Sequence, residues 1–238
     1  MARKTSHVLT SGSLQTPFAE AYRGLRANIN FTTIGQGARA VLVTSGKSGE
    51  GKSTTVANLA ILLAQAGHRV IMVDADFRRP RLRHLFSSNG NGHGVQRAPD
   101  PGLSDLIEGT ATFLEVAAPV DGFDNLWLIA TGRIPKNPSE LLNSPQMRAV
   151  IVDLCDRADI VLLDSPPSSV YADAVGLTQV TDGVLYVLKS GPQGPVDHVR
   201  LLKQLQQGKA RLIGIVMNQV EAGAAGYGPY HAGGAPRG

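Results

Sequence analysis

The sequence has a single cysteine, Cys155, and therefore cannot form an internal disulfide bond. This suits a reducing compartment, and we expect a cytoplasmic protein. The cysteine lies in a segment whose apolar residues, such as Ile151 and Leu154, recur with helical spacing, so we expect it to be buried as a small apolar side chain.

Long apolar stretches are also missing. No segment approaches the roughly 18 apolar residues that a membrane span requires, and no apolar run of the signal-peptide kind follows Arg3 and Lys4. A function at the membrane would therefore depend on a partner that holds the chain there.

No long run of basic residues accompanies the formal net charge of +4 and the pI of about 9.4. This charge would permit binding to nucleic acid or acidic lipid, but the basic residues are scattered along the chain. A mildly basic, soluble surface is the simpler interpretation, and we expect no nucleic-acid partner.

Six short apolar runs recur along the chain, at 40–43, 70–73, 126–129, 160–163, 184–188 and 212–217. Continuous apolar runs predict strands that are covered on both faces. Helical patterns lie between them, including 53–66 before Gly67 and 196–207 before Gly208. The alternation predicts an α/β fold with a doubly wound, mostly parallel sheet.

The length of 238 residues, 42% of them hydrophobic, is enough for one well-packed domain. We expect a flexible N-terminus over 1–15, the domain over 16–221, and a disordered tail rich in Gly and Ala over 222–238. The segment 87–102 is rich in Gly, Asn and Pro, which is typical of a mobile surface loop.

A phosphate-binding pattern, G-x-x-x-x-G-K-[ST], matches the segment GKSGEGKS after the first apolar run. The glycines let successive N–H groups turn inward, toward which the following helix also directs its positive end. We expect Lys52 to reach the β- and γ-phosphates and the Ser53 hydroxyl to bind Mg²⁺. A Gly-rich turn is the alternative, but the flanking strand and helix favour a nucleotide. The predicted nucleotide-binding residues here are Gly46, Lys47, Ser48, Gly49, Glu50, Gly51, Lys52, Ser53 and Thr54.

Three aspartates follow apolar runs and are candidate Mg²⁺ ligands together with Ser53. Asp74 and Asp76 lie two residues apart, so both carboxylates project to one side of an extended chain. The alternative is an Asp-rich strand end that caps the next helix. Asp164 ends the run IVLLD, the form of a Walker B acid.

Asn218 follows the last apolar run. Its amide could read an adenine ring by donating and accepting hydrogen bonds. A turn-forming Asn is the alternative.

An N-terminal helix is predicted from Thr16 and Pro17, which form an N-cap and first-turn pair. Its apolar stripe consists of Phe18, Tyr22, Leu25 and Ile29. The opposite side carries Glu20, Arg23 and Arg26.

These motifs together resemble the P-loop ATPases of the partitioning and cell-division-site type. They resemble most their kinase branch, the bacterial tyrosine kinases (BY-kinases) of capsule and exopolysaccharide export. The resemblance extends from about Thr16 to Val220, and its most specific segments are EAYRGLR, DADFRRP and NPSELL.

The resemblance implies an ATP- and Mg²⁺-dependent autokinase in which Lys52, Asp74 and Asp76 are catalytic. One of the two aspartates is expected to accept the phenol proton of the incoming tyrosine. The implied phosphoacceptors are Tyr227 and Tyr230, presented by a neighbouring subunit; a tail without function is the alternative.

The resemblance also implies that Glu20, Arg23 and Arg26, which match an E-x-x-R-x-x-R motif, contact a neighbouring subunit, and a ring of subunits is one form such an oligomer could take. A solvated helix face with a Glu–Arg pair is the alternative. The expected second partner is a separate transmembrane activator that recruits the kinase to the inner face of the plasma membrane.

Lys47 occupies the position of the signature lysine of partitioning ATPases, which reaches across a dimer to the partner's phosphates. It leaves open an ATPase dimer switch without kinase activity. A lysine without any role in a dimer is equally compatible with the pattern.

Overall fold

The structure is a computed structural model that describes residues 8–9, 16–32, 37, 39–87, 94–95, 101–170, 172–191, 198–207 and 211–220. The helices are α1 (Pro17–Thr32), α2 (Lys52–Gln65), α3 (Leu82–Ser87), α4 (Leu103–Glu108), α5 (Phe113–Val116), α6 (Pro138–Leu142), α7 (Pro145–Arg157), α8 (Asp173–Leu177) and α9 (His198–Gln206). The strands are β1 (Ala40–Ser45), β2 (Val70–Asp74), β3 (Ala117–Pro119), β4 (Leu126–Ile129), β5 (Ile160–Asp164), β6 (Gly183–Lys189) and β7 (Arg211–Asn218).

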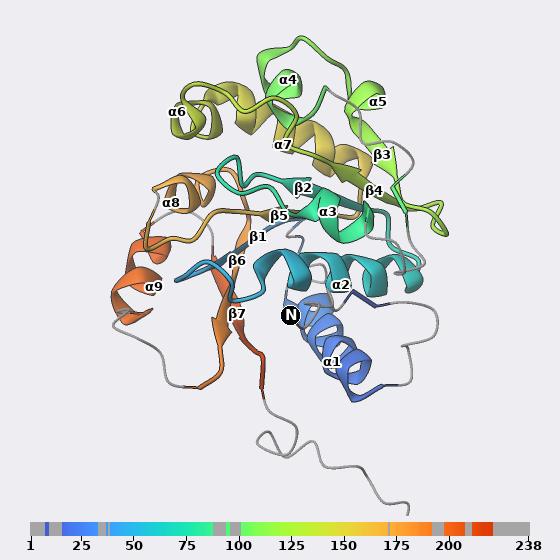
Figure 1. The fold of residues 1–238 in the computed structure, drawn as a ribbon, viewed down its shortest axis with the longest axis vertical. Coiled ribbons are helices and arrows are strands. Elements are labelled where there is room, and N and C mark those ends of the chain that lie inside the picture. Colours follow the sequence, from blue (N-terminus) through green and yellow to red (C-terminus); the bar gives the residue numbers. More distant parts are fainter. Residues whose placement is uncertain are drawn as a thin grey trace, which may run out of the picture.

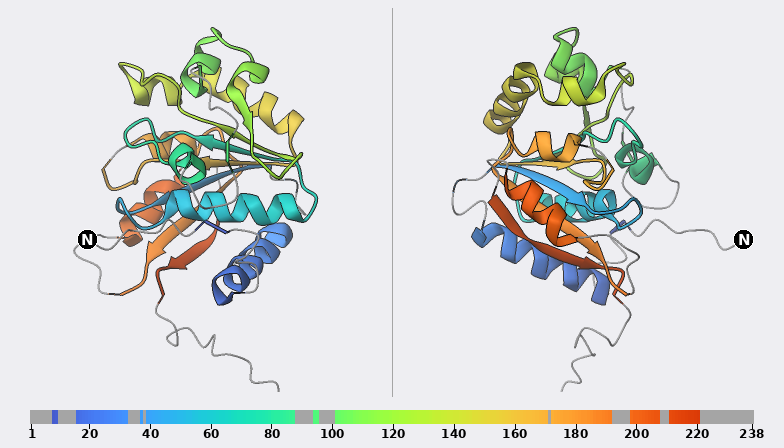
Figure 2. Two further views of the ribbon diagram at one scale, coloured as in Figure 1. Left: turned by 45° about the vertical axis from the view of Figure 1, so that its right-hand side comes forward. Right: turned by 90° about the vertical axis from the view of Figure 1, so that its left-hand side faces the viewer.

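The strands form one seven-stranded sheet in the order β3-β4-β2-β5-β1-β6-β7 (Figure 1). All neighbouring strands are parallel except β3, which runs antiparallel to β4 at one edge. Helices cover both faces of the sheet, with α1 and α2 on one face and α7 and α9 on the other (Figure 2). The predicted α/β class with a mostly parallel sheet is therefore confirmed.

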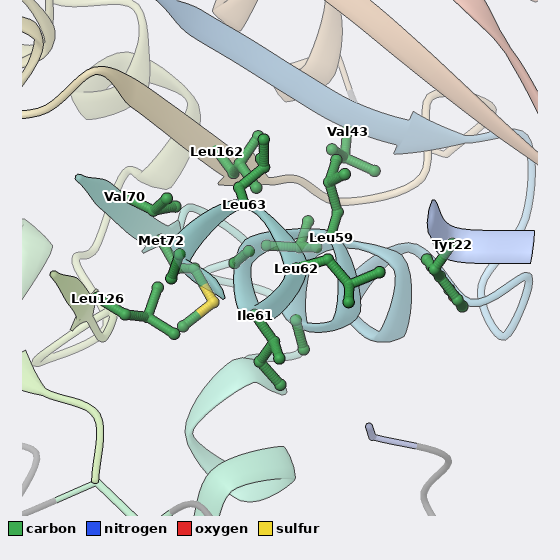
Figure 3. Close-up of a cluster of buried hydrophobic side chains, with 14 of the residues drawn as sticks. Tyr22, Val43, Leu59, Ile61, Leu62, Leu63, Val70, Met72, Leu126 and Leu162 are labelled. Atoms are coloured by element: carbon green, nitrogen blue, oxygen red, sulfur yellow. The ribbon is translucent and has the colours of Figure 1, made fainter. Parts of the chain in front are cut away.

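Alternate residues of each strand enter two separate cores, because successive side chains of a strand point to opposite faces. Val41 and Val43 pack with α1, α2 and α3, whereas Ala40 and Leu42 pack with α7 and α8. On the first face, Leu59 and other apolar residues of α2 lie directly against the sheet (Figure 3). Burial of each such side chain contributes about 1.5–3 kcal/mol, which explains why both faces of the central strands are apolar.

The carboxyl ends of the parallel strands meet at one edge of the sheet. Residues that follow β1, β2, β5 and β7 therefore lie near one another, although they are distant in sequence. In doubly wound proteins this edge is where ligands bind.

Several elements differ from the sequence expectation. The strand β3 was not predicted, since three residues that include Pro119 carry too little pattern; the proline is tolerated because β3 is an edge strand. Val8 and Leu9, which lie within the N-terminus expected to be flexible, are buried, and the Leu9 N–H donates to Asn58 Oδ1 over 2.7 Å. The domain boundaries stay a prediction.

Of the expected surface loop, the structure describes only Gly94 and Val95 between the end of α3 and residue 101. Val95 forms an isolated antiparallel bridge with Val120. The expected tail, 222–238, lies outside the described residues.

None of the helices in the described part of the chain combines the length and apolar character that crossing a bilayer requires.

Candidate functional site

The predicted phosphate loop joins β1 to α2. Gly49 and Gly51 have φ angles of 86° and 97°, a left-handed conformation that glycine adopts without steric cost. Gly51 is the residue that precedes α2, and its carbonyl accepts the Thr55 N–H over 2.8 Å. The loop therefore leads directly into the N-terminus of a helix, the local structure that attracts phosphate.

The Glu50 side chain turns inward and closes the loop on itself. Its Oε2 accepts the Lys47 N–H over 2.8 Å, and the residue is only 2% exposed. At the end of β1, which leads into the loop, the Ser45 hydroxyl donates to the Lys47 carbonyl over 2.7 Å. The motif treats the position of Glu50 as variable, so no sequence signal indicated this role. Ser48 and Gly49 are exposed at the tip of the loop, and the Lys47 side chain is half-buried.

Ser53 and Asp164 meet beneath the loop, where the Ser53 hydroxyl donates to Asp164 Oδ2 over 2.5 Å. Burial raises the pKa of the Asp164 carboxyl to about 7, although the nearby charge of Lys52 and the bond from Ser53 act in the opposite direction. Lys52 is itself 6% exposed. The other oxygen, Oδ1, is buried and has no hydrogen-bond partner among the described residues.

Asp74 and Asp164 are adjacent in the register of β2 and β5. Burial raises the pKa of the Asp74 carboxyl well above its usual value, and the charge of Asp164 acts in the same direction. Asp74 Oδ2 also accepts the N–H groups of Arg81 and Leu82 at 3.0 Å each, where α3 begins. Asp74 thus caps the next helix and also lies beside Asp164, so the two interpretations of its sequence position are compatible.

Asp76 lies at the same edge and is 6% exposed. Its Oδ1 accepts the N–H groups of Arg78 and Arg79 at 3.1 and 2.9 Å, which fixes the turn after β2.

The donor set fits Mg²⁺ with a nucleoside phosphate. One hydroxyl and the carboxylates of Asp74, Asp76 and Asp164 are hard oxygen ligands, and an orphaned carboxylate oxygen at Asp164 leaves a place for a cation. No group of three or more acidic, His or Cys side chains forms a metal cage within the described ranges. Mg²⁺ usually binds one or two carboxylates plus the phosphates, so such a cage is not required.

Asn218 lies at the end of β7 and approaches the loop closely. Its Nδ2 donates to the Glu50 carbonyl over 2.8 Å, and its Oδ1 accepts the Gln219 N–H over 2.9 Å. The structure brings Asn218 to the phosphate loop, and its contact with adenine stays a prediction.

The side chains of Tyr186 and His198 also lie beside the loop, and the sequence analysis did not predict them as part of the site. Tyr186 on β6 packs under the first glycine of the loop, with its hydroxyl 2.9 Å from His198 Nδ1. A Cβ atom on Gly46 would lie 2.8 Å from that hydroxyl, so the position requires glycine. The apolar run around Tyr186 indicated only a core residue.

Arg78 links two of the segments that carry the family resemblance. Its Nε donates to Asp173 Oδ2 over 3.2 Å, and its Nη2 donates to Ser139 Oγ over 3.0 Å. Ser139 also donates to Asp173. The DADFRRP and NPSELL segments therefore pack together, a contact that the sequence alone could not reveal.

The predicted oligomer-contact residues lie on α1. Arg23 pairs with Glu20 at 2.6 Å, whereas Arg26 donates to the Leu62 carbonyl near the end of α2 over 3.1 Å. Their role between subunits stays a prediction, and Tyr227 and Tyr230 lie outside the described residues.

Comparisons with known proteins give the family of the chain. Residues 41–227 match the family described as "CobQ/CobB/MinD/ParA nucleotide binding domain". The tyrosine-protein kinase YwqD of Bacillus subtilis (strain 168) is 34% identical over 200 residues, which cover 84% of this chain and 80% of that protein.

Two solved structures are similar as well. The crystal structure of the chimerical protein CapA2B2 has a TM-score of 0.77 and 29% identity, over 90% of this chain and 92% of that one. The kinase domain of the Escherichia coli tyrosine kinase ETK has a TM-score of 0.76 and 25% identity, over 90% of this chain and 82% of that one. The chain therefore belongs to the CobQ/CobB/MinD/ParA family of nucleotide-binding domains and, within it, to the bacterial tyrosine kinases, which confirms the resemblance drawn from its motifs.

Proposed function

We propose that this chain is an ATP-dependent tyrosine autokinase that phosphorylates Tyr227 and Tyr230 of a neighbouring copy. The observation that carries the proposal is the Ser53–Asp164 contact beneath the phosphate loop, with Asp74 beside Asp164 at the same sheet edge. The proposal is supported because these oxygens suit a hard cation and the adjacent loop suits phosphate.

In this mechanism, ATP with Mg²⁺ supplies the transferable phosphoryl group and offsets part of its charge. Lys52 supplies a buried positive charge at the first position of α2. Ser53 and Asp164 would hold the cation, and Asp74 would contribute from the adjacent strand.

We assign Asp76 as acceptor of the phenol proton. Both backbone N–H groups that bind it use Oδ1, while Asp74 is tied to the start of α3. A phenol with a pKa of about 10 is protonated at neutral pH, so a nearby carboxylate assists its attack.

The biological setting follows from the family resemblance. We infer that the kinase regulates capsular or exopolysaccharide export and that a transmembrane activator recruits it to the inner face of the plasma membrane. An experiment on this function therefore uses protein taken from its own cells, where such an activator is present.

The test is mass spectrometry of the C-terminal peptide that contains Tyr227 and Tyr230. We expect phosphate on this peptide in the wild type and none in Lys52→Met, because the loop then lacks the charge that stabilises phosphoryl transfer. Lys203→Met is the matched control, since this lysine is exposed on α9, and it should leave the phosphorylation unchanged.

An unmodified tail during active export would contradict the autokinase. If nucleotide hydrolysis then disappeared in Lys47→Ala and survived the loss of both tail tyrosines, the ATPase dimer switch would be supported instead.

A further inference from the structure

Side chains at the end of β7 donate hydrogen bonds to two consecutive peptide groups on the outside of the phosphate loop. Asn218 Nδ2 donates to the Glu50 carbonyl over 2.8 Å, and Gln219 Nε2 donates to the Gly49 carbonyl over 3.1 Å. The two contacts join residues that are 168 and 170 positions apart in the sequence. Neither bond belongs to the phosphate-binding pattern itself.

These bonds control where the loop's own N–H groups point. In a trans peptide unit the carbonyl and the following N–H lie on opposite sides. A Gly49 carbonyl held toward β7 turns the Glu50 N–H away from β7, and a Glu50 carbonyl held toward β7 does the same to the Gly51 N–H. Successive N–H groups that face one way form an anion-binding nest.

The backbone and a hydrogen bond at the end of β7 fix the orientation of these two side chains. Gln219 has a φ of 56°, a left-handed conformation uncommon outside glycine that persists where the surroundings hold it. Its N–H donates to Asn218 Oδ1 over 2.9 Å, so the Asn218 amide must present Nδ2 to the loop. A Cβ atom on Gly51 would lie 1.8 Å from that Nδ2, so only glycine permits the approach.

We propose that Asn218 and Gln219 are positioning residues that orient the Glu50 and Gly51 N–H groups toward phosphate before the nucleotide arrives. The inference rests on the proposed nucleotide site and assigns Asn218 a task other than reading adenine. An amide nitrogen has two hydrogens and an amide oxygen two lone pairs, so base recognition remains chemically open to the same side chain. Binding measurements separate the two roles.

The experiment is calorimetric titration of ATP, GTP and inorganic pyrophosphate, each with Mg²⁺, into the wild type and two variants. For Asn218→Ala and Gln219→Ala we expect all three ligands to bind about three- to tenfold more weakly, as one hydrogen bond is lost. The ratio of ATP to GTP affinity should not change, because the orientation of loop N–H groups affects phosphate alone. Gln206→Ala, at an exposed glutamine of α9, is the matched control.

Gln219→Gly separates positioning from folding. Glycine adopts the left-handed conformation at no steric cost, so the thermal unfolding midpoint should not fall, while the affinity for pyrophosphate should fall as in Gln219→Ala. If Asn218→Ala does not fold, the two variants at exposed Gln219 still carry the test.

The proposal is overturned if Asn218→Ala changes the ATP to GTP ratio but not pyrophosphate binding, since Asn218 then reads the base. It is also overturned if none of the variants weakens pyrophosphate. A wild type that binds none of the three ligands would remove the nucleotide site altogether. A wild type that binds them but never phosphorylates its tail would contradict only the proposed kinase function.

Discussion

Asp74 and Asp164 are buried carboxyl groups that lie side by side, and their burial costs free energy of folding. Both are 0% exposed, and burial raises the pKa of each. A buried carboxylate needs a counter-charge, which Lys52 supplies only in part to Asp164. A divalent cation would supply the remaining positive charge. We therefore expect the folded protein to be less stable without the cation than with it.

This arrangement predicts a pH-dependent stability in the absence of metal. The pKa of Asp164 is about 7 in the folded protein and about 4 in the unfolded chain, so between these values only the unfolded state loses its proton. The free energy of unfolding should therefore fall as the pH rises from about 4 to about 7. Asp164→Asn should show a shallower dependence in thermal unfolding with EDTA.

Asp124→Asn, at an exposed aspartate, is the control for the loss of a carboxylate. An Asp164→Asn profile parallel to that of the wild type would show that Asp164 is not protonated in the folded protein.

At the scale of elements, α1 is attached to the domain through its apolar stripe and through polar contacts, among them those of Tyr22 and Arg26 with α2. Tyr22 and Ile29 are buried, and Arg26 donates to the Leu62 carbonyl in the last turn of α2, where the negative end of the helix dipole attracts a cation. The Glu20–Arg23 pair is more exposed and adds little to stability. The three residues of the motif thus have different physical roles within one subunit.

The prediction for α1 separates its docking from assembly. The double variant Glu20→Ala, Arg23→Ala should change the free energy of unfolding by less than about 0.5 kcal/mol, yet reduce the mass measured by light scattering if the motif joins subunits. Arg26→Ala should lower stability by about 1 kcal/mol, because it also loses an internal hydrogen bond. An unchanged mass in the double variant would leave the pair as a solvated helix face.

The elements also show which parts of the fold the sequence could predict. The central strands and α2 were predicted because continuous apolar runs and a helix after a P-loop are strong signals. Strand β3 and the short helices α5 and α6 were missed, since three to five residues are too few to show a period. Packing decides their positions instead, since α5 contacts β3 at the sheet edge and α6 packs against α7 and α8.

For the whole molecule, we expect phosphorylation to control assembly. Each phosphate adds about −1.5 to −2 charge to the tail, and a tail so charged is disfavoured next to a site lined by Asp74, Asp76 and Asp164. Autophosphorylated protein should therefore be smaller in light scattering than Lys52→Met protein at the same concentration. Tyr227→Phe, Tyr230→Phe is the control that keeps the active site intact, and equal masses in all three samples would contradict the mechanism.

Local sequence patterns were enough to predict the family and the kind of site in this chain. The P-loop, the aspartates that end two strands and the segments shared with BY-kinases are local patterns, and parallel strands bring their ends to one edge whatever their order. In the part of the chain that the structure describes, Lys52, Ser53, Asp74, Asp76, Asp164 and Asn218 lie at that edge, and their roles stay predictions.

The hydrogen bonds that hold these residues in place became visible in the folded chain alone. The Glu50 carboxylate accepts the Lys47 N–H, and Asp74 caps α3 while lying beside Asp164. The side-chain amides of Asn218 and Gln219 donate to carbonyls of the loop. Each of these depends on the direction of a hydrogen-bonding group, and the contacts of Asn218 and Gln219 also join residues that are distant in sequence. Residue type shows what a side chain is able to donate or accept, and the packing of strands and loops selects its partner.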